Sequence, residues 1–233
     1  MNHWWLPADA AAHGPALDRE LHLALTLLFG LAVLAHMVML IALLRRRSQQ
    51  CRSIIAMELL PFCVIAGLFI WMGVRAERLW AQMRYAGADY SAMQVEVVGE
   101  QFVWYVRYPG EDAKFGITRP ELVDAGAGNP LGLDQRDDAA HDDRVSSELV
   151  LPVNREVDLR LRSLDVIHGF SAPELRIKQN AVPGQTIHIH FTPTQVGRFA
   201  VLCTQVCGLG HYRMSATIRV VSPEEFERWS AAR

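Results

Sequence analysis

The sequence of 233 residues predicts an all-β sandwich domain anchored by an N-terminal hairpin of two membrane-spanning helices. Two long apolar segments come first, and short runs rich in β-branched and aromatic residues follow from residue 93. A cluster of Cys, His and Met side chains near the C-terminus predicts a metal site on the sandwich. The predicted parts are an N-terminal segment over 1–20, the hairpin over 21–75, a linker over 76–92, the sandwich over 93–222 and a C-terminal helix over 223–233.

The predicted hairpin consists of the apolar segments 21–44 and 54–74. The first contains no Asp, Glu, Lys or Arg, and the second is interrupted only by Glu58 and Pro61. The connecting loop, 45–53, carries four arginines and no acid, so the positive-inside rule places it in the cytoplasm and both termini outside. Arginines also flank the outer ends, so this orientation rests on the denser, unopposed charge of the loop.

Some polar and aromatic residues of this N-terminal part have two interpretations. Glu58 is a candidate proton-path residue, or it pairs with Arg52 or a neighbouring subunit. Trp4 and Trp5 suit either a membrane interface or a partner subunit. Residues 1–20 lack the apolar core of a cleavable signal, so none is expected.

Alternating and β-branched runs predict the strands of the sandwich. A Ser-Pro-Glu-Glu start at Ser222 then predicts the short terminal helix. The insertion over 111–144 contains an acidic cluster and is predicted to be a solvated loop, the alternative being a docking surface for a basic partner. The predicted strands are 94–98, 102–108, 148–152, 156–161, 186–191, 198–203 and 214–221.

The metal cluster is Cys203-Thr-Gln-Val-Cys207-Gly-Leu-Gly-His211-Tyr-Arg-Met214. Thiolate and thioether ligands favour copper, and a Cys/His set with a weak axial Met is typical of electron-transfer copper. A mononuclear site of that kind needs one Cys, so two predict thiolates that bridge a pair of coppers. Bridging lets one unpaired electron spread over both metals with little rearrangement. The cluster therefore predicts an electron relay.

Two further ligands complete this set. His168, between strand-like runs, is the candidate for the second imidazole. The backbone carbonyl of Gln205 is the candidate partner of the copper that lacks Met214. The alternatives for Cys203 and Cys207 are a disulfide or a zinc site, whereas Cys51 and Cys63 are expected to be small apolar residues of the second helix or its border.

The Cys-x3-Cys-x3-His-x2-Met pattern, with Asp165-Val-Ile-His168-Gly-Phe170 and Pro173-Glu-Leu-Arg-Ile-Lys-Gln-Asn-Ala-Val-Pro-Gly184, resembles subunit II of the haem–copper cytochrome c oxidases. The resemblance covers nearly the whole chain. It implies a membrane-anchored cupredoxin-like fold with the binuclear copper centre called CuA. The implied ligands are His168, Cys203, Gln205, Cys207, His211 and Met214.

The same resemblance implies function and partners. The chain would take electrons from cytochrome c or a similar donor and pass them to haem in subunit I, where oxygen reduction to water and proton translocation would occur. It would lie in a bacterial plasma membrane among other oxidase subunits and lipid, with the copper domain and both termini on the periplasmic side. No nucleic-acid partner is expected.

Three departures from the family pattern qualify this expectation. Phe102 stands where the family has the Trp between donor and copper, and Trp104 matches the second, structural aromatic residue. Gln205 replaces the usual Glu, and a neutral amide is a poorer magnesium ligand, so magnesium is doubtful. Asn180 stands where the family frequently has an Asp, in the loop that faces subunit I. Asp165 matches an acidic family position beside the first copper His and is a candidate donor contact.

The sequence is also compatible with other functions. A nitric oxide reductase can carry the same copper module, because its catalytic metals lie in another subunit. A membrane-tethered copper carrier would need open, Met- or His-rich sites, unlike ligands set in a sandwich. A quinol oxidase subunit typically lacks the two cysteines. His188 and His190 share a strand face and could bind metal, but an exposed polar face is the simpler interpretation.

Overall fold

The computed structural model describes residues 6–45 and 55–232, which fall into two compact units. One unit is helical and covers Pro15–Ala86. The other is a β domain that begins at Gly87 and includes the N-terminal residues up to Gly14. The predicted loop 45–53, with Cys51, lies outside the described residues except for Arg45, and so do Trp4 and Trp5.

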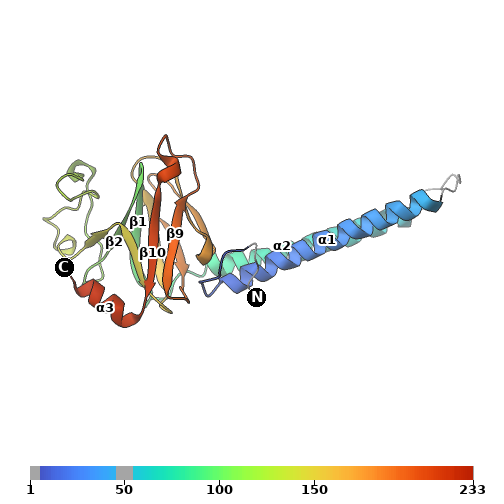
Figure 1. Cartoon of the computed structure of the whole chain (residues 1–233), viewed down its shortest axis with the longest axis horizontal. Coiled ribbons are helices and arrows are strands. Elements are labelled where there is room, and N and C mark those ends of the chain that lie inside the picture. The colour runs from blue at the N-terminus through green and yellow to red at the C-terminus, as the bar shows by residue number, and fades with distance from the viewer. Residues whose placement is uncertain (1–5, 46–54, 233) are drawn as a thin grey trace. The chain divides into compact units, whose positions relative to one another are not determined.

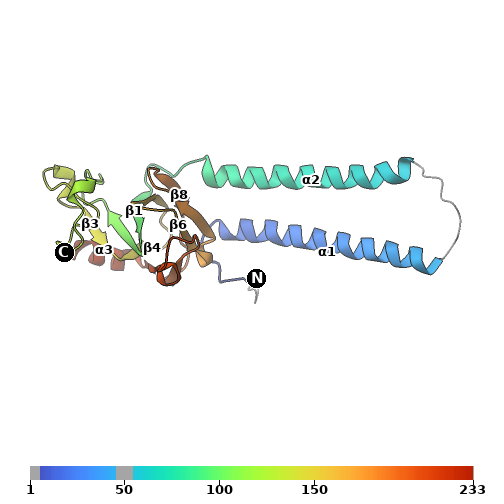
Figure 2. The ribbon, with the colours of Figure 1, turned by 90° about the horizontal axis from the view of Figure 1, so that it is seen from above.

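The helical unit consists of α1 (Gly14–Arg45) and α2 (Ile55–Arg84), seen side by side in Figure 2. Both are long and apolar enough to cross a membrane. α2 continues ten residues past the predicted end at residue 74, because residues 75–84 are mostly strong helix formers such as Arg, Ala, Glu, Leu and Gln. The linker to the β domain is therefore shorter than predicted.

Polar residues of the helices have partners within the helical unit. Glu20 accepts a hydrogen bond from Arg75 Nε at 3.2 Å and forms an ion pair with the same guanidinium. His36 Nδ1 lies 2.7 Å from the carbonyl oxygen of Ala32, one turn earlier. These contacts reduce the cost of placing polar side chains in apolar helices.

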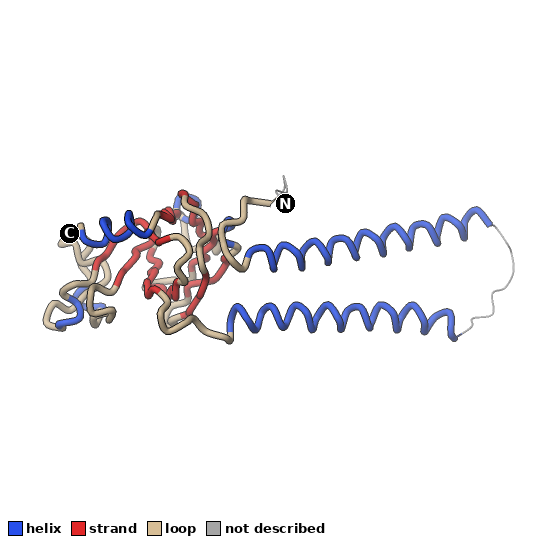
Figure 3. Tube along the Cα trace, turned by 90° about the horizontal axis from the view of Figure 1, so that it is seen from below, coloured by secondary structure: helices blue, strands red, loops and turns tan. Residues whose placement is uncertain are grey.

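Two five-stranded sheets pack face to face in the β domain, as the prediction of a sandwich requires (Figures 1 and 3). The first sheet has the order β3-β2-β1-β5-β8 and the second has the order β4-β10-β9-β6-β7. In the first, the bounds are β3 (Arg144–Ser146), β2 (Val103–Tyr108), β1 (Met93–Glu100), β5 (Val157–Ser163) and β8 (Ile187–Phe191). In the second, they are β4 (Glu148–Pro152), β10 (Ser215–Val221), β9 (Gly197–Cys203), β6 (His168–Ala172) and β7 (Ile177–Ala181).

Strands β3, β6 and β7 were not predicted. β7 shows the alternation that could have revealed it, since Ile177 and Ala181 are buried while Lys178 and Asn180 are exposed. β6 is buried at every position and contains Gly169 and Ser171, so its sequence carries no alternation. β6 lies between β9 and β7 in the sheet, and its register places His168 beside the end of β9.

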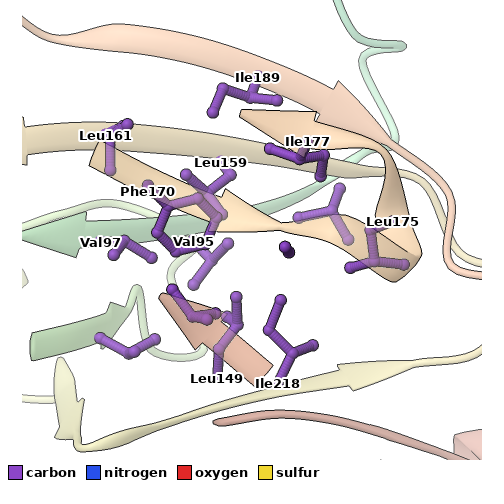
Figure 4. Packing of buried hydrophobic residues seen from close by; sticks show 14 of the residues in the cluster. Val95, Val97, Leu149, Leu159, Leu161, Phe170, Leu175, Ile177, Ile189 and Ile218 are labelled. Carbon is purple, nitrogen blue, oxygen red and sulfur yellow. The ribbon is translucent and has the colours of Figure 1, made fainter. Parts of the chain in front are cut away.

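Apolar side chains from both sheets interdigitate between the layers (Figure 4). Leu159 and Leu161 of β5 belong to the same buried cluster as Leu149 and Ile218 of the opposite sheet, and each of the four is at most 1% exposed. This close-packed interior is the main source of stability of a sandwich and fixes the ends of the strands. The loops at those ends therefore have a rigid support.

The N-terminal segment belongs to the β domain. Ala10 N–H donates to the carbonyl of Glu174 at 2.8 Å, and Thr194 N–H donates to the carbonyl of Ala10 at 2.8 Å. Ala10 and Ala11 are buried against the sandwich. The chain before α1 is thus tied to the same domain that follows α2, so both lie on one side of any membrane that the hairpin spans.

The insertion is a loop with two short 3-10 turns whose residues are mostly exposed or half-buried, as predicted, but it is also fixed to the sheet at both ends. Arg107 of β2 is buried, donates to Asp143 Oδ2 at 3.1 Å and to Glu96 Oε2 at 3.4 Å, and also bonds the carbonyl of Gly116. Phe115 stacks over its guanidinium, with its ring centroid 5.1 Å away. A buried ion pair at the sheet therefore holds both ends of the insertion, which hydropathy alone could not reveal.

The acidic cluster of the insertion is bound mainly to its own loop. Asp134 is 4% exposed and accepts hydrogen bonds from Arg119 and Arg136, which hold its pKa well below the usual range. Asp137 accepts the backbone N–H of Ile117 at 2.6 Å. These internal bonds favour a structural role for the cluster over the docking surface considered above.

Candidate metal centre

The predicted ligands come together at one end of the sandwich. His168 is the first residue of β6 and Cys203 is the last of β9, and these strands are neighbours in the same sheet. Cys207 follows in the β9–β10 loop, at the top of the domain in Figure 1. The ligand atoms of His168, Cys203 and Cys207 all lie within 4.8 Å of one another.

The sulfur of Cys207 lies among the other donors. It is 3.8 Å from Cys203 Sγ, 3.8 Å from Met214 Sδ and 3.7 Å from His211 Nδ1. The carbonyl oxygen of Gln205 lies 3.2 Å from Cys203 Sγ. All six predicted ligand residues thus contribute to one group of sulfur, nitrogen and oxygen atoms.

His168 is oriented by Asp165. The ring is fully buried, and its Nε2 lies 2.8 Å from Asp165 Oδ1. Its Nδ1 is buried and has no hydrogen-bond partner among the described residues. An Nε2–H that donates to the carboxylate leaves the Nδ1 lone pair free, as in a metal-binding histidine.

Asp165 is in turn held by the backbone. The N–H groups of Gln101 and Val166 donate to its carboxylate at 2.8 and 2.7 Å. Burial opposes ionisation of Asp165, but the hydrogen bonds from His168 and these backbone groups outweigh it and lower its pKa. The carboxylate therefore stays ionised and keeps His168 in one tautomer.

A bound cation would stabilise the ionised form of the two neighbouring thiols. Burial and the adjacent Cys203 thiol raise the pKa of Cys207 to about 11. A bound metal reverses this effect, because it replaces the protons and neutralises the thiolates. Both cysteines are free thiols, and their 3.8 Å separation is well beyond the about 2.05 Å of a disulfide.

The donor set fits copper on these observations. Two buried thiols, a buried thioether and a buried imidazole nitrogen without a partner form a soft set of ligands, and Met214 is only 2% exposed. Such a set selects copper over hard cations. The site is closed by protein on most sides, which suits electron transfer better than substrate binding.

Trp104 packs against the imidazole of His168. It is 1% exposed and meets the rings of His168 and Phe170 edge to face, with centroids 5.7 and 5.5 Å away. A Cβ on Gly99 would lie 2.9 Å from both His168 Cδ2 and Trp104 Cζ3, so glycine is required there. Trp104 thus lies in the core beside the site.

Phe102 lies under the metal-binding loop. A Cβ added to Gly210 would lie 2.4 Å from Phe102 Cδ2, and one added to Gly208 would lie 3.1 Å from the same ring. The Arg213 guanidinium is 5.8 Å from the ring centroid. Phe102 is therefore half-buried between the loop and the core. Leu209 and Tyr212 of the same loop are far more exposed.

Gln101 is a site residue that the sequence reasoning missed. Its Nε2 donates to the carbonyl of Cys207 at 2.5 Å, and its N–H binds Asp165. No local sequence pattern signals this role, because it depends on the β1–β2 turn meeting the β9–β10 loop. His188, by contrast, binds Asp158 at 2.9 Å on the outer face of the other sheet and does not join the cluster.

Replacing Asp165 by Asn is expected to weaken copper binding by about 10–100-fold, the usual cost of losing the hydrogen bond that orients a metal-binding histidine. A competition titration with a copper chelator on the full chain would measure this. Asp158→Asn is the matched control, since Asp158 also binds a histidine but lies away from the cluster. Equal affinity of Asp165→Asn and the unmodified chain would contradict the role of Asp165.

Comparisons with known proteins find similar sequences over the β domain. The family profile described as "Cytochrome C oxidase subunit II, periplasmic domain" matches residues 93–221. An alternative cytochrome c oxidase subunit 2 of Bradyrhizobium diazoefficiens is 36% identical over 153 residues, covering 65% of this chain and 54% of the relative. Cytochrome c oxidase subunit 2 of Cereibacter sphaeroides is 32% identical over 168 residues, covering 65% of this chain and 52% of the relative.

A solved structure is also similar. The periplasmic domain of subunit II of cytochrome oxidase from Bradyrhizobium japonicum has 26% sequence identity and a TM-score of 0.46, covering 62% of this chain and 94% of that structure. The chain spans about half the length of the curated relatives it matches. Because the family profile covers more than half of the chain, this protein belongs to the family of cytochrome c oxidase subunit II.

Proposed function

We propose that this chain is the electron-accepting subunit of a terminal respiratory oxidase and holds a binuclear copper centre. The observation that carries the proposal is the convergence of two thiols, the free Nδ1 of His168, His211 and the Met214 thioether at one end of the sandwich. When bound, a copper pair in such a set supplies reversible one-electron storage.

The residues of the chain have distinct roles in this proposal. Cys203 and Cys207 would hold both metals, His168 and His211 would each bind one, and Met214 and the Gln205 carbonyl would be weak ligands. Asp165 fixes the tautomer of His168. Trp104 packs against the imidazole and is itself packed against Phe170. A ligand group held this rigidly changes little between oxidation states, which favours fast electron transfer.

The proposed path leads from a c-type cytochrome to the metal end and then to haem in a partner subunit I, where oxygen is reduced and protons are translocated. Phe102 or Trp104 would lie on or beside this path. Other oxidase subunits and membrane lipid would surround α1 and α2, whose apolar side chains are largely exposed. Magnesium is left out of the proposal, since Gln205 offers no carboxylate.

The proposed location is a bacterial plasma membrane, with the β domain and both termini on the periplasmic side. Two apolar helices and the pairing of residues 10–12 with the β domain support it. The same copper module in a nitric oxide reductase is the second candidate, since the ligand set of the described residues does not depend on the terminal electron acceptor. The buried ligands argue against a copper carrier, which must release its metal.

The proposal is tested with the full chain in detergent, loaded with copper and mixed with reduced cytochrome c. The expected result is two coppers per chain, and oxidation of cytochrome by one electron per copper pair. One copper per chain, or none that accepts electrons, would contradict the proposal. Assembly with its partner subunit, followed by oxygen and nitric oxide consumption, would distinguish the two candidates.

A further inference from the structure

A groove of about 280 Å³ lies between the segment that precedes α1 and the β6–β7 hairpin. Leu6 and Pro7 line it from the segment over residues 6–13, called here the strap, and Pro173 and Ile177 line it from the hairpin. Its surface is almost entirely apolar, and Ile177 is part of the core cluster, so one wall is rigid (Figure 4). The volume is near the lower end of the about 300–1,000 Å³ typical of small-molecule sites, which suits part of a long apolar molecule.

The groove lies away from the metal centre. In the β6–β7 hairpin, His168 pairs with Ala181 at one end and Ala172 pairs with Ile177 at the other. Pro173 and Ile177 are therefore at the end of the hairpin opposite to His168. An occupant of the groove would not compete with the loops that surround the metal ligands.

The groove combines its apolar surface with positive charge. Two basic side chains, Arg176 and Lys178, also line it, and none of the described residues that line it is acidic. Lys178 is exposed on β7. Arg176 Nη1 donates to the carbonyl of Pro173 at 2.7 Å, and its Nη2 donates to the carbonyl of Pro7 at 2.9 Å. Because carbonyl groups are neutral, these two bonds orient the guanidinium without cancelling its charge.

The backbone of Arg176 supports a role for its side chain. Its φ is 54°, in the left-handed region that glycine adopts readily and that other residues adopt at a cost. The bond to Pro7 offsets part of that cost and holds the guanidinium against the strap. Arg176 thus joins the strap to the hairpin and supplies charge to the space between them.

The strap continues into a helix that can cross a membrane. Pro7 lies seven residues before Gly14, the first residue of α1, and α1 is long and apolar enough to span a bilayer. At most about 25 Å of extended chain separates these two residues. Phospholipid is therefore the molecule with both an apolar chain and a charged group that is most available to the groove.

We propose that the groove binds an anionic phospholipid, with part of one acyl chain against Leu6 and Ile177 and the head-group phosphate at Arg176 and Lys178. Charge complementarity selects an anionic head group over a zwitterionic one, because both charged residues of the groove are basic. A soluble phosphate compound would leave the apolar wall uncovered. The bound lipid joins the strap to β7 and gives the β domain a contact with the membrane in addition to its helices.

Acylation of lysine amines, mapped by mass spectrometry, tests this proposal directly. The chain contains only two lysines, Lys178 in the groove and Lys114 in the insertion, so Lys114 is an internal control. The full chain is placed in nanodiscs of phosphatidylcholine, with or without added phosphatidylglycerol, at one salt concentration. Lys178 should react about fivefold more slowly in the anionic discs, the effect of one favourable contact between a basic side chain and an anionic head group. Lys114 should react at the same rate in both.

Two variants separate binding in the groove from general attraction to an anionic membrane. Leu6→Ser removes part of the apolar wall and should reduce the protection of Lys178 to less than about twofold. Arg176→Gly suits the left-handed backbone, removes the guanidinium and should have the same effect. Val123→Ser is the matched control for Leu6→Ser, because Val123 is a partly exposed apolar residue of the insertion, and it should leave the protection unchanged.

Three results would overturn the proposal. Equal reaction rates of Lys178 in the two kinds of disc would exclude an anionic lipid. Full protection in Leu6→Ser would mean that Lys178 faces an anionic surface without an acyl chain in the groove. Protection of Lys178 in neutral discs by soluble glycerophosphate would assign the site to phosphate alone. Near-ultraviolet circular dichroism of each variant shows whether it is folded, and the measurement needs no copper, so it is independent of the proposed function.

Discussion

Cys207→Ser is expected to abolish the copper pair. The Cys207 sulfur lies within 3.8 Å of the donor atoms of Cys203, His211 and Met214. Its loss therefore removes the ligand that lies next to the other three. A serine hydroxyl is a hard donor that stays protonated at neutral pH and cannot replace a bridging thiolate. The loss of copper affinity should exceed the about 10–100-fold effect of removing an outer hydrogen bond.

Metal analysis of the full chain after copper loading and desalting would measure this effect. Cys63→Ser is the matched control, because Cys63 is an exposed free thiol on α2. The control should bind copper like the unmodified chain, whereas Cys207→Ser should retain at most a single, weakly bound copper. Two tightly bound coppers in Cys207→Ser would contradict the assignment of the bridging ligand.

Arg107→Ala is expected to lower the free energy of unfolding of the β domain by about 3–5 kcal/mol, the usual cost of removing one member of a buried ion pair. The substitution leaves Asp143 buried without its cation, and it leaves Glu96 with Arg162 as its one remaining cation partner among the described residues. Burial already raises the pKa of Asp143 even with Arg107 present. The carboxylates would therefore protonate or draw water into the sheet, and the insertion would lose its attachment.

Urea denaturation in detergent, followed by near-ultraviolet circular dichroism, would report this change. Arg136→Ala is the control: it also pairs with an aspartate, Asp134, but its side chain is 78% exposed. Exposed pairs contribute about 0–1 kcal/mol, so the control should remain near the stability of the unmodified chain. Equal stability of both variants would show that the Arg107 network does not hold the insertion.

The sandwich and the hairpin could be predicted because their signals are local. The alternation in β1 and the β-branched run in β2 are visible in short windows, and the apolar segments are long. β6 could not be predicted, since it is buried throughout and includes Gly169 and Ser171. The end of α2 was misplaced because hydropathy falls at residue 75 while helix propensity does not.

The ligand set was predictable for a similar reason, because five of its six residues lie in one short motif. The residues that orient it were harder to find. Gln101 reaches Cys207 from a turn more than a hundred residues earlier. Asp165 was predicted as a donor contact, and its hydrogen bond to His168 was not foreseen. Such roles depend on which loops meet at one end of the sandwich, a property of the folded chain alone.

The central claim is that this chain holds two coppers that share one unpaired electron. Electron paramagnetic resonance of the oxidised, copper-loaded full chain tests it most directly. The account predicts a signal in which the electron couples equally to two copper nuclei, together with purple thiolate-to-copper absorption. Coupling to a single copper nucleus, or no thiolate absorption, would contradict it.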